Sequence, residues 1–202
     1  MAESKRKLGQ VIITQVQPFG LIFEVPAGEI YDPSRRVEVP RLSISSQGVE
    51  GETAQGERLL DIHHADHPET HNNGKNAISI GFTSHYNMMR TRFGDHMQTG
   101  SAGENIIIEY DQEVWLPDLG HKVQFKNPES GQVVSLEVIK FAAPCNPFSH
   151  FAADSQDKRL GTEDLKDTLQ FLGNGRRGFL LSLGADQETG LVQSGDVVYA
   201  IS

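Results

Sequence analysis

The sequence predicts a mainly β, barrel-like domain with one or two helices packed on it. Short apolar runs rich in Val, Ile, Phe and Leu recur along the chain, and 20 glycines are distributed among them. Glycines between short apolar runs are typical of tight turns that connect strands. Strands and helices do not alternate regularly, which argues against a parallel α/β sheet and favours a barrel. We expect residues 1–202 to form a single domain.

The strands expected in the first half of the chain are short and are bounded by turn-forming residues. They cover residues 9–16, 21–25, 36–44 and 76–82. The polar, glycine-rich stretch 47–58 predicts a loop instead. Thr83 or Ser84 is a candidate N-cap for a helix. From there the apolar spacing becomes helical and places Tyr86, Met89 and Phe93 on one face. We interpret that face as core packing.

The second half of the chain adds four expected strands and the clearest helix. The strands cover residues 121–125, 132–141, 179–183 and 197–201. The helix has Thr162 as its expected N-cap, and Leu165, Leu169 and Leu172 share one of its faces. Gly173 suits the position just after the last turn of this helix.

Charge and composition restrict the class of protein. The formal net charge is −9 and the sequence pI is about 5.3, which argues against a nucleic-acid partner because phosphate backbones require a basic face. A single cysteine allows no internal disulfide. The charged start of the chain and the interrupted apolar stretch after it make a poor signal sequence, and no apolar run is long enough to span a membrane. We therefore expect a soluble, cytoplasmic protein without a membrane partner.

The only cysteine, Cys145, follows the expected strand 132–141 and comes directly after Pro144. Because proline has no N–H to donate to a sheet, the strand should end there, leaving Cys145 where a strand meets a loop. Such a position suits a reactive group, although a lone cysteine is more often a packed apolar residue. A reactive thiol needs a lowered pKa, for which His150 or an arginine from another element could supply the positive charge.

Four histidines between residues 61 and 73 form a second candidate site. They are His63, His64, His67 and His71, with two aspartates close by in sequence. Imidazole and carboxylate groups are ligands for zinc and similar metals, so one hypothesis is a zinc-type binding module or hydrolase. Their spacing matches no established metal motif, and the alternative is a polar surface loop.

The segment 99–105 is a glycine-spaced polar turn that leads into three consecutive isoleucines. Small residues let backbone N–H groups approach a ligand closely, so this turn could hold an anion, or it could be a simple turn. A further hypothesis treats the whole chain as a non-catalytic barrel module that binds a partner protein, with Cys145 merely packed.

Several of these segments, in this order, resemble motifs of the MOSC family, which is named for the C-terminal domain of molybdenum cofactor sulfurases. They are the early glycine turn 48–52, the Gly-x-x-Gly-Glu-Asn turn 100–105 leading into a strand, the Pro-Cys pair 144–145, and the closing segments 178–180 and 190–196. The resemblance covers roughly residues 40–202, and the order and spacing of the motifs make it specific.

The resemblance implies a strand-rich barrel that binds molybdenum cofactor (molybdopterin) or handles sulfur destined for it. Cys145 would be a sulfur carrier or a molybdenum ligand, and the activity that of a sulfurtransferase or of a molybdenum-dependent reductase of N-hydroxylated compounds. A cysteine desulfurase or an electron-donor protein would be its partner, and the family also has an association with pyridoxal phosphate. The residues expected near the cofactor are Ser101, Gly103, Glu104, Asn105, Pro144, Asn146 and Arg90.

The sequence departs from the family pattern at two places. Many members have Arg before the Pro-Cys pair, but this chain has Ala143, so one expected cationic contact is missing. The early turn often reads Gly-Asp with a histidine nearby, whereas this chain has Gly51-Glu52 and its histidines lie further along. His85, Arg90 and Arg92 are other candidates for anion contacts, with surface ion pairing as the alternative.

Overall fold

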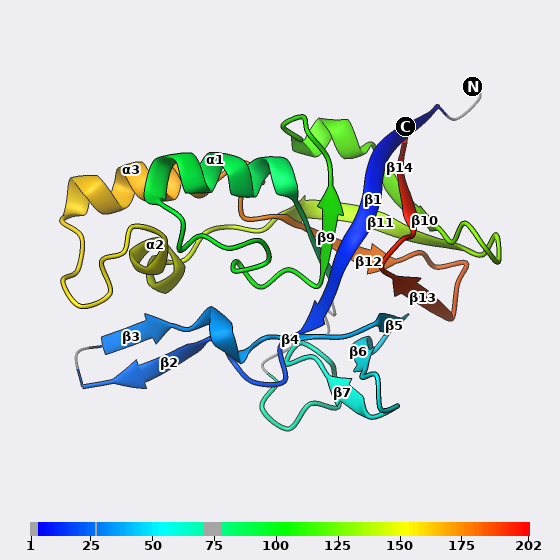
Figure 1. Cartoon of the computed structure of the whole chain (residues 1–202), viewed down its shortest axis with the longest axis horizontal. Helices are drawn as coiled ribbons and strands as arrows, with labels where there is room; N and C mark the ends of the chain where they lie inside the picture. Colours follow the sequence, from blue (N-terminus) through cyan, green and yellow to red (C-terminus); the bar gives the residue numbers. More distant parts are fainter. Residues whose placement is uncertain (1–3, 27, 71–77) are drawn as a thin grey trace.

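The computed structural model describes residues 4–26, 28–70 and 78–202. Seven strands close into a barrel in the order β1-β14-β10-β11-β12-β8-β9 and back to β1, as the sequence predicts. Their bounds are β1 (Lys5–Val16), β8 (Ile78–Phe82), β9 (Ile106–Glu109), β10 (Lys122–Lys126), β11 (Val133–Phe141), β12 (Phe179–Leu183) and β14 (Val197–Ile201). All neighbouring pairs are antiparallel except β8 and β9, which run parallel. Figure 1 shows β1 running along the whole barrel.

Apolar side chains fill the inside of the barrel. Inward-facing residues alternate with outward-facing ones along each strand, so every strand contributes to one core. Among the fully buried members are Leu8, Ile80, Phe82, Phe125, Leu136, Leu181 and Val198. The barrel is therefore a packed core, and a ligand site has to lie outside it.

A second, four-stranded sheet lies beside the barrel in the order β13-β5-β6-β7. Its strands are β5 (Arg41–Ser45), β6 (Gly48–Glu52), β7 (Arg58–Leu60) and β13 (Thr189–Gln193). The prediction of a loop over 47–58 holds for residues 53–57 but is wrong for Gly48–Glu52 and Arg58, because β6 is held by backbone pairing on both sides rather than by an apolar pattern. Gly51 also packs tightly on Val16 and Val39, where an added Cβ would lie 3.0 Å from a methyl group of each.

The strand expected over 36–44 is divided. Its first part is β4 (Val37–Glu38), which pairs with β1, and its second part belongs to β5. Pro40 separates the two, since proline cannot donate to a strand ladder. A two-stranded hairpin, β2 (Ile22–Val25) with β3 (Gly28–Tyr31), precedes it.

Three α-helices lie outside the barrel in the described part of the chain, with two short 3₁₀ turns at Pro33–Arg35 and Leu116–Leu119. The helices are α1 (Thr83–Phe93), α2 (Asn146–Ala152) and α3 (Thr162–Leu172), and Figure 1 shows them with the β2–β3 hairpin on one side of the molecule. Helix α2 was not predicted, because seven residues with a proline in the first turn carry no periodic pattern. Within the described ranges, no helix has the length and apolar content needed to cross a membrane.

The helices and the hairpin enclose a second apolar cluster. Tyr86 and Met89 are fully buried in it, which confirms their interpretation as core residues. The N-caps predicted for α1 and α3 lie too far along the chain. The N-cap of α1 is Phe82 and that of α3 is Gly161, and neither helix has a side-chain cap. Both helices are therefore held by packing rather than by capping hydrogen bonds.

Removing a barrel core side chain should destabilise the fold far more than removing an exposed one of the same type. Phe125 is 1% exposed, whereas Phe19 is 53% exposed. We expect Phe125→Ala to lower the free energy of unfolding by about 3–5 kcal/mol, because it leaves a cavity in the core. Phe19→Ala loses a cation–π contact with Arg35 and should cost less than about 1 kcal/mol. Urea denaturation of both variants compares them, and equal losses would contradict the packed-core description.

Candidate functional site

A pocket of about 310 Å³ lies on the outer face of the barrel wall. Ser79, Leu180 and Lys140 are neighbours in register across β8, β12 and β11, and all three line it. Their sequence neighbours Ile80 and Leu181 are buried in the barrel core, so the pocket residues face away from it. The other lining residues are Gln17, His63, Ala102, Gly103, Glu104, Ala142, Ala143 and Arg177. This volume is at the lower end of the range of small-molecule sites.

A bulge in β11 precedes the pocket. The pairing of β11 with β12 shifts between Val138 and Lys140, so Ile139 is the extra residue. An extra residue bends the strand and redirects the side chains that follow. The bulge therefore places Lys140 on the pocket side of the strand. Because a bulge is not visible in the sequence, the charge of Lys140 could not be assigned to the site from the sequence alone.

Arg177 provides a cation whose orientation is fixed. Its Nη1 donates a hydrogen bond to the carbonyl oxygen of Ala143 at 2.7 Å, and its guanidinium carbon lies 5.3 Å from the ring centroid of Phe148. Among the described residues, its buried Nε has no hydrogen-bond partner, and no carboxylate lies within 4 Å of the guanidinium. A positive charge is therefore present beside Ala143. It comes from the segment before β12, whereas the family pattern has an arginine at the position of Ala143 itself.

The backbone of turn 99–105 is engaged within the protein. The N–H of Ala102 donates to the Tyr86 hydroxyl at 3.0 Å, that of Gly103 to the carbonyl of Gly100 at 3.0 Å, and that of Asn105 to Ser79 Oγ at 3.1 Å. Of the two alternatives for this turn, these three N–H groups favour the simple turn, because they already have partners within the protein. The turn instead fixes the position of the side chains around it.

Glu104 is the buried acid of the pocket wall. Its Oε2 accepts a hydrogen bond from the Tyr86 hydroxyl, while Oε1 has no partner among the described residues. The side chain fits where Gly81 and Gly178 have no Cβ, since a Cβ at either glycine would collide with it. Burial raises the pKa of Glu104 to about 7, against the opposing effect of the Tyr86 hydrogen bond and of nearby Arg177. This carboxyl therefore changes its charge near neutral pH.

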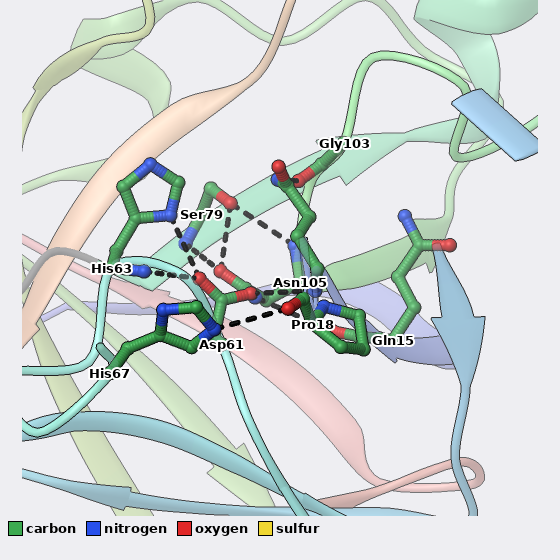
Figure 2. A network of polar contacts seen from close by, with 9 residues as sticks. Gln15, Pro18, Asp61, His63, His67, Ser79, Gly103 and Asn105 are labelled. Carbon is green, nitrogen blue, oxygen red and sulfur yellow. Dashed lines mark hydrogen bonds and ion pairs between the residues drawn. The ribbon is translucent and has the colours of Figure 1, made fainter. Parts of the chain in front are cut away.

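A buried hydrogen-bond network joins the loop after β7 to the barrel (Figure 2). Asn105 Oδ1 accepts from the N–H and Oγ of Ser79, at 3.0 and 2.9 Å, and Asn105 Nδ2 donates to Asp61 Oδ2 at 2.9 Å. Asp61 also accepts from the backbone N–H groups of Gln17 and His63. Burial opposes ionisation of Asp61, but its hydrogen bonds with His63 and Gln17 outweigh that effect and lower its pKa. The network places His63 at the pocket.

The histidines of this loop do not converge. His63 Nδ1 lies 2.8 Å from Asp61, buried His64 has its Nε2 3.7 Å from Glu50, and His67 Nε2 lies 3.1 Å from the carbonyl oxygen of Pro18. In the described ranges, no group of three or more His, Cys, Asp or Glu side chains could hold a metal ion. His71 lies outside those ranges. The described part of the loop therefore lends no support to the zinc hypothesis.

Cys145 is the N-cap residue of α2 and is partly exposed. It packs against the second apolar cluster and is not among the residues that line the pocket, although Ala142 and Ala143 are. His150 is buried and accepts the N–H of Leu160 at Nδ1. Burial and nearby Arg159 lower the pKa of His150, so it is not the cation that the sequence suggested for Cys145.

The remaining predicted site residues divide into three groups. Gly103 and Glu104 line the pocket, while Ser101 and Asn105 are buried close to them in the same turn. Pro144 and Asn146 flank Cys145 and do not line the pocket. Two further candidates make contacts elsewhere: Arg90 donates to the carbonyl of Met97 and to Thr99, and Arg92 forms an ion pair with Asp167. Buried His85 accepts the N–H of Val114.

The interaction between Asp61 and His63 should be visible as a pH effect. The hydrogen bond that the His63 ring donates to Asp61 raises the pKa of His63 above the value of about 6.5 for an unperturbed histidine. A raised folded-state pKa stabilises the fold below the unfolded value, and this contribution is lost as the pH rises through the folded value. Solvent weakens it, because the His63 side chain is 61% exposed. NMR titration of His63 should show the raised pKa in the wild type and a lower one in Asp61→Asn.

The matched control for this titration is Asp66→Asn, which changes an exposed carboxylate in the same loop. It should leave the His63 titration as in the wild type. A His63 pKa that is unchanged by Asp61→Asn would contradict the assignment of the pair.

Comparison with known proteins identifies the family. The family model described as "MOSC domain" matches residues 61–199. Among solved structures, the chain is similar to the YuaD protein from Bacillus subtilis, with 14% identity, a TM-score of 0.54, and coverage of 100% of this chain and 98% of that chain. It is also similar to YiiM from Geobacillus stearothermophilus, with 14% identity, a TM-score of 0.49, and coverage of 98% and 75%.

At these identities the likeness to YuaD shows a common fold and nothing more. No curated protein sequence matches the chain. The family match covers well over half of the residues, including the turn 100–105, the Pro-Cys pair and the strand that follows Arg177. The chain therefore belongs to the MOSC domain family.

Proposed function

We propose that this chain binds molybdenum cofactor in the pocket on the outer barrel wall, with Cys145 as a molybdenum ligand or as a sulfur carrier. One observation supports the proposal above the others. The pocket is bordered by both family motifs, through Gly103 and Glu104 on one side and through Ala142 and Ala143, which lead to Cys145, on the other. A ligand held here would lie between the two segments that carry the family resemblance.

The residues of the pocket fit an anionic, phosphate-bearing pterin. Arg177 and Lys140 bring positive charge to a chain whose net charge is −9, and neither has a carboxylate within 4 Å among the described residues. Glu104 is largely uncharged below about pH 7, so it does not repel an anion there. When bound, the cofactor would supply the redox or sulfur-accepting chemistry, while the protein holds and orients it.

Cys145 has the chemistry for either role. Thiolate is a soft ligand that suits a metal centre with sulfur ligands. The carbonyl oxygen of Cys145 accepts hydrogen bonds from the N–H and Oγ of Ser149, both at 2.9 Å, which fixes the backbone while the sulfur makes no capping bond. The sulfur is therefore available for bonding in a rigid position.

In the carrier role, the thiolate of Cys145 attacks the outer sulfur of a persulfide on a donor protein. The sulfur–sulfur bond of the donor breaks, a new one forms on Cys145, and the donor leaves as a thiolate, so electrons and atoms balance. The donor would be a cysteine desulfurase. In the ligand role, an electron-donor protein would instead be the partner, and the reaction would be the reduction of an N-hydroxylated compound.

Reconstitution with isolated molybdenum cofactor tests the proposal. After desalting, wild-type protein should retain molybdenum and pterin in near-equal amounts, measured by elemental analysis and by pterin fluorescence. Cys145→Ser should lose molybdenum if the thiol is a ligand. If the thiol is a carrier, wild-type protein treated with a persulfide donor should gain the mass of one sulfur atom, and Cys145→Ser should not.

Ser130→Ala, in the exposed turn before β11, is the control and should behave as the wild type in both measurements. The proposal is overturned if the wild type retains neither molybdenum nor pterin and gains no sulfur. It is also overturned if Cys145→Ser equals the wild type in both assays.

A further inference from the structure

The Arg177 end of the pocket combines a fixed cation with a buried acid. Arg177 is oriented by the carbonyl oxygen of Ala143 and by the ring of Phe148, and its Nε has no hydrogen-bond partner among the described residues. Glu104 is 2% exposed, and one of its two carboxyl oxygens is without a partner in the same part of the structure. The two residues line the same pocket, and the charge of Arg177 favours the ionised form of Glu104.

We propose that this end of the pocket is a subsite for an oxyanion of the phosphate or sulfate class, and that its occupation places a proton on Glu104. The inference deepens the proposed function, since it names the groups that would hold the anionic part of the ligand. It assigns to Arg177 the binding of the anion and to Glu104 the accompanying change in protonation.

The charges around Glu104 explain the coupling. The cations Arg177 and Arg36 favour its ionised form, whereas burial disfavours it. The Tyr86 hydroxyl donates to Glu104 in the ionised state. An anion bound to Arg177 offsets the cation that helps to keep Glu104 ionised, and its own charge repels the carboxylate. Both effects favour uptake of a proton.

The direction of the pH effect follows from linkage. Because Glu104 has a pKa of about 7 before the anion binds, it is already neutral at lower pH, and no proton needs to be taken up there. Above that pH a proton accompanies each anion, so the affinity should fall by up to about tenfold per pH unit. His63 also lines the pocket and has a raised pKa, so it could contribute a similar effect.

Isothermal titration calorimetry with inorganic sulfate tests this inference. Sulfate keeps the same charge around neutral pH, so any proton exchanged belongs to the protein. Titrations slightly above pH 7 in two buffers with different ionisation enthalpies give the number of protons taken up. Wild-type protein should take up as much as one proton per sulfate, and Glu104→Gln should bind sulfate without that uptake.

Three further variants separate the contributions. Arg177→Gln should weaken sulfate binding by at least about tenfold, since a desolvated charge-assisted bond is lost. Arg58→Gln, which changes an exposed arginine on β7, should leave binding unchanged. His63→Gln should retain the proton uptake if Glu104 is its source. Proton uptake in Glu104→Gln that equals the uptake of the wild type, or equal affinities in Arg177→Gln and the wild type, overturns the inference.

Two further measurements test the inference if Glu104→Gln does not fold and separate it from the proposed function. If Glu104→Gln does not fold, infrared difference spectra of the wild type should show a protonated carboxyl band on addition of sulfate, and its absence counts against the inference. Sulfate binding needs neither cofactor nor Cys145. Coupled sulfate binding without cofactor retention therefore overturns the proposed function alone, and cofactor retention without coupled sulfate binding overturns this inference alone.

Discussion

The buried contact between Asp61 and Asn105 is the interaction on which the arrangement of the site depends. Asp61 accepts four hydrogen bonds, one from Asn105, one from Gln17 and two from His63. A carboxylate that is nearly inaccessible to water persists only when its oxygens are satisfied in this way. Asn105 is also bonded to Ser79 of β8, so a single amide holds the histidine loop, the glycine turn and the barrel wall together. Each of these three segments contributes to the pocket.

The charges of the pocket run against those of the chain as a whole. A protein with a net charge of −9 keeps Arg177 and Lys140 at one concave site, where neither is neutralised by a described carboxylate. The acid that does lie there, Glu104, is buried deeply enough to be neutral through part of the physiological pH range. Burial thus removes a negative charge that would weaken anion binding, and it does so without removing the residue that anchors Tyr86.

The sequence predicted most of the barrel because its inner strands, such as β12 and β14, carry apolar patterns of their own. It failed at β6, whose pairing partners are visible only in three dimensions, and at α2, which is too short for a period. The resemblance to the family motifs predicted Gly103 and Glu104 as site residues, and both line the pocket. Lys140 and Arg177 could not be predicted from the sequence, because a strand bulge places the first and a hydrogen bond to the loop residue Ala143 places the second.

The separation between the packed barrel interior and the external pocket has a consequence for how this protein can change over evolutionary time. Along β8 and β12, alternate residues serve different purposes: Ile80 and Leu181 are packed in the core, while Ser79 and Leu180 line the pocket. A substitution at an outward position leaves the apolar interior intact. Substitutions at every second position of a strand can therefore change the lining of the pocket over evolutionary time while the stability of the barrel is largely kept.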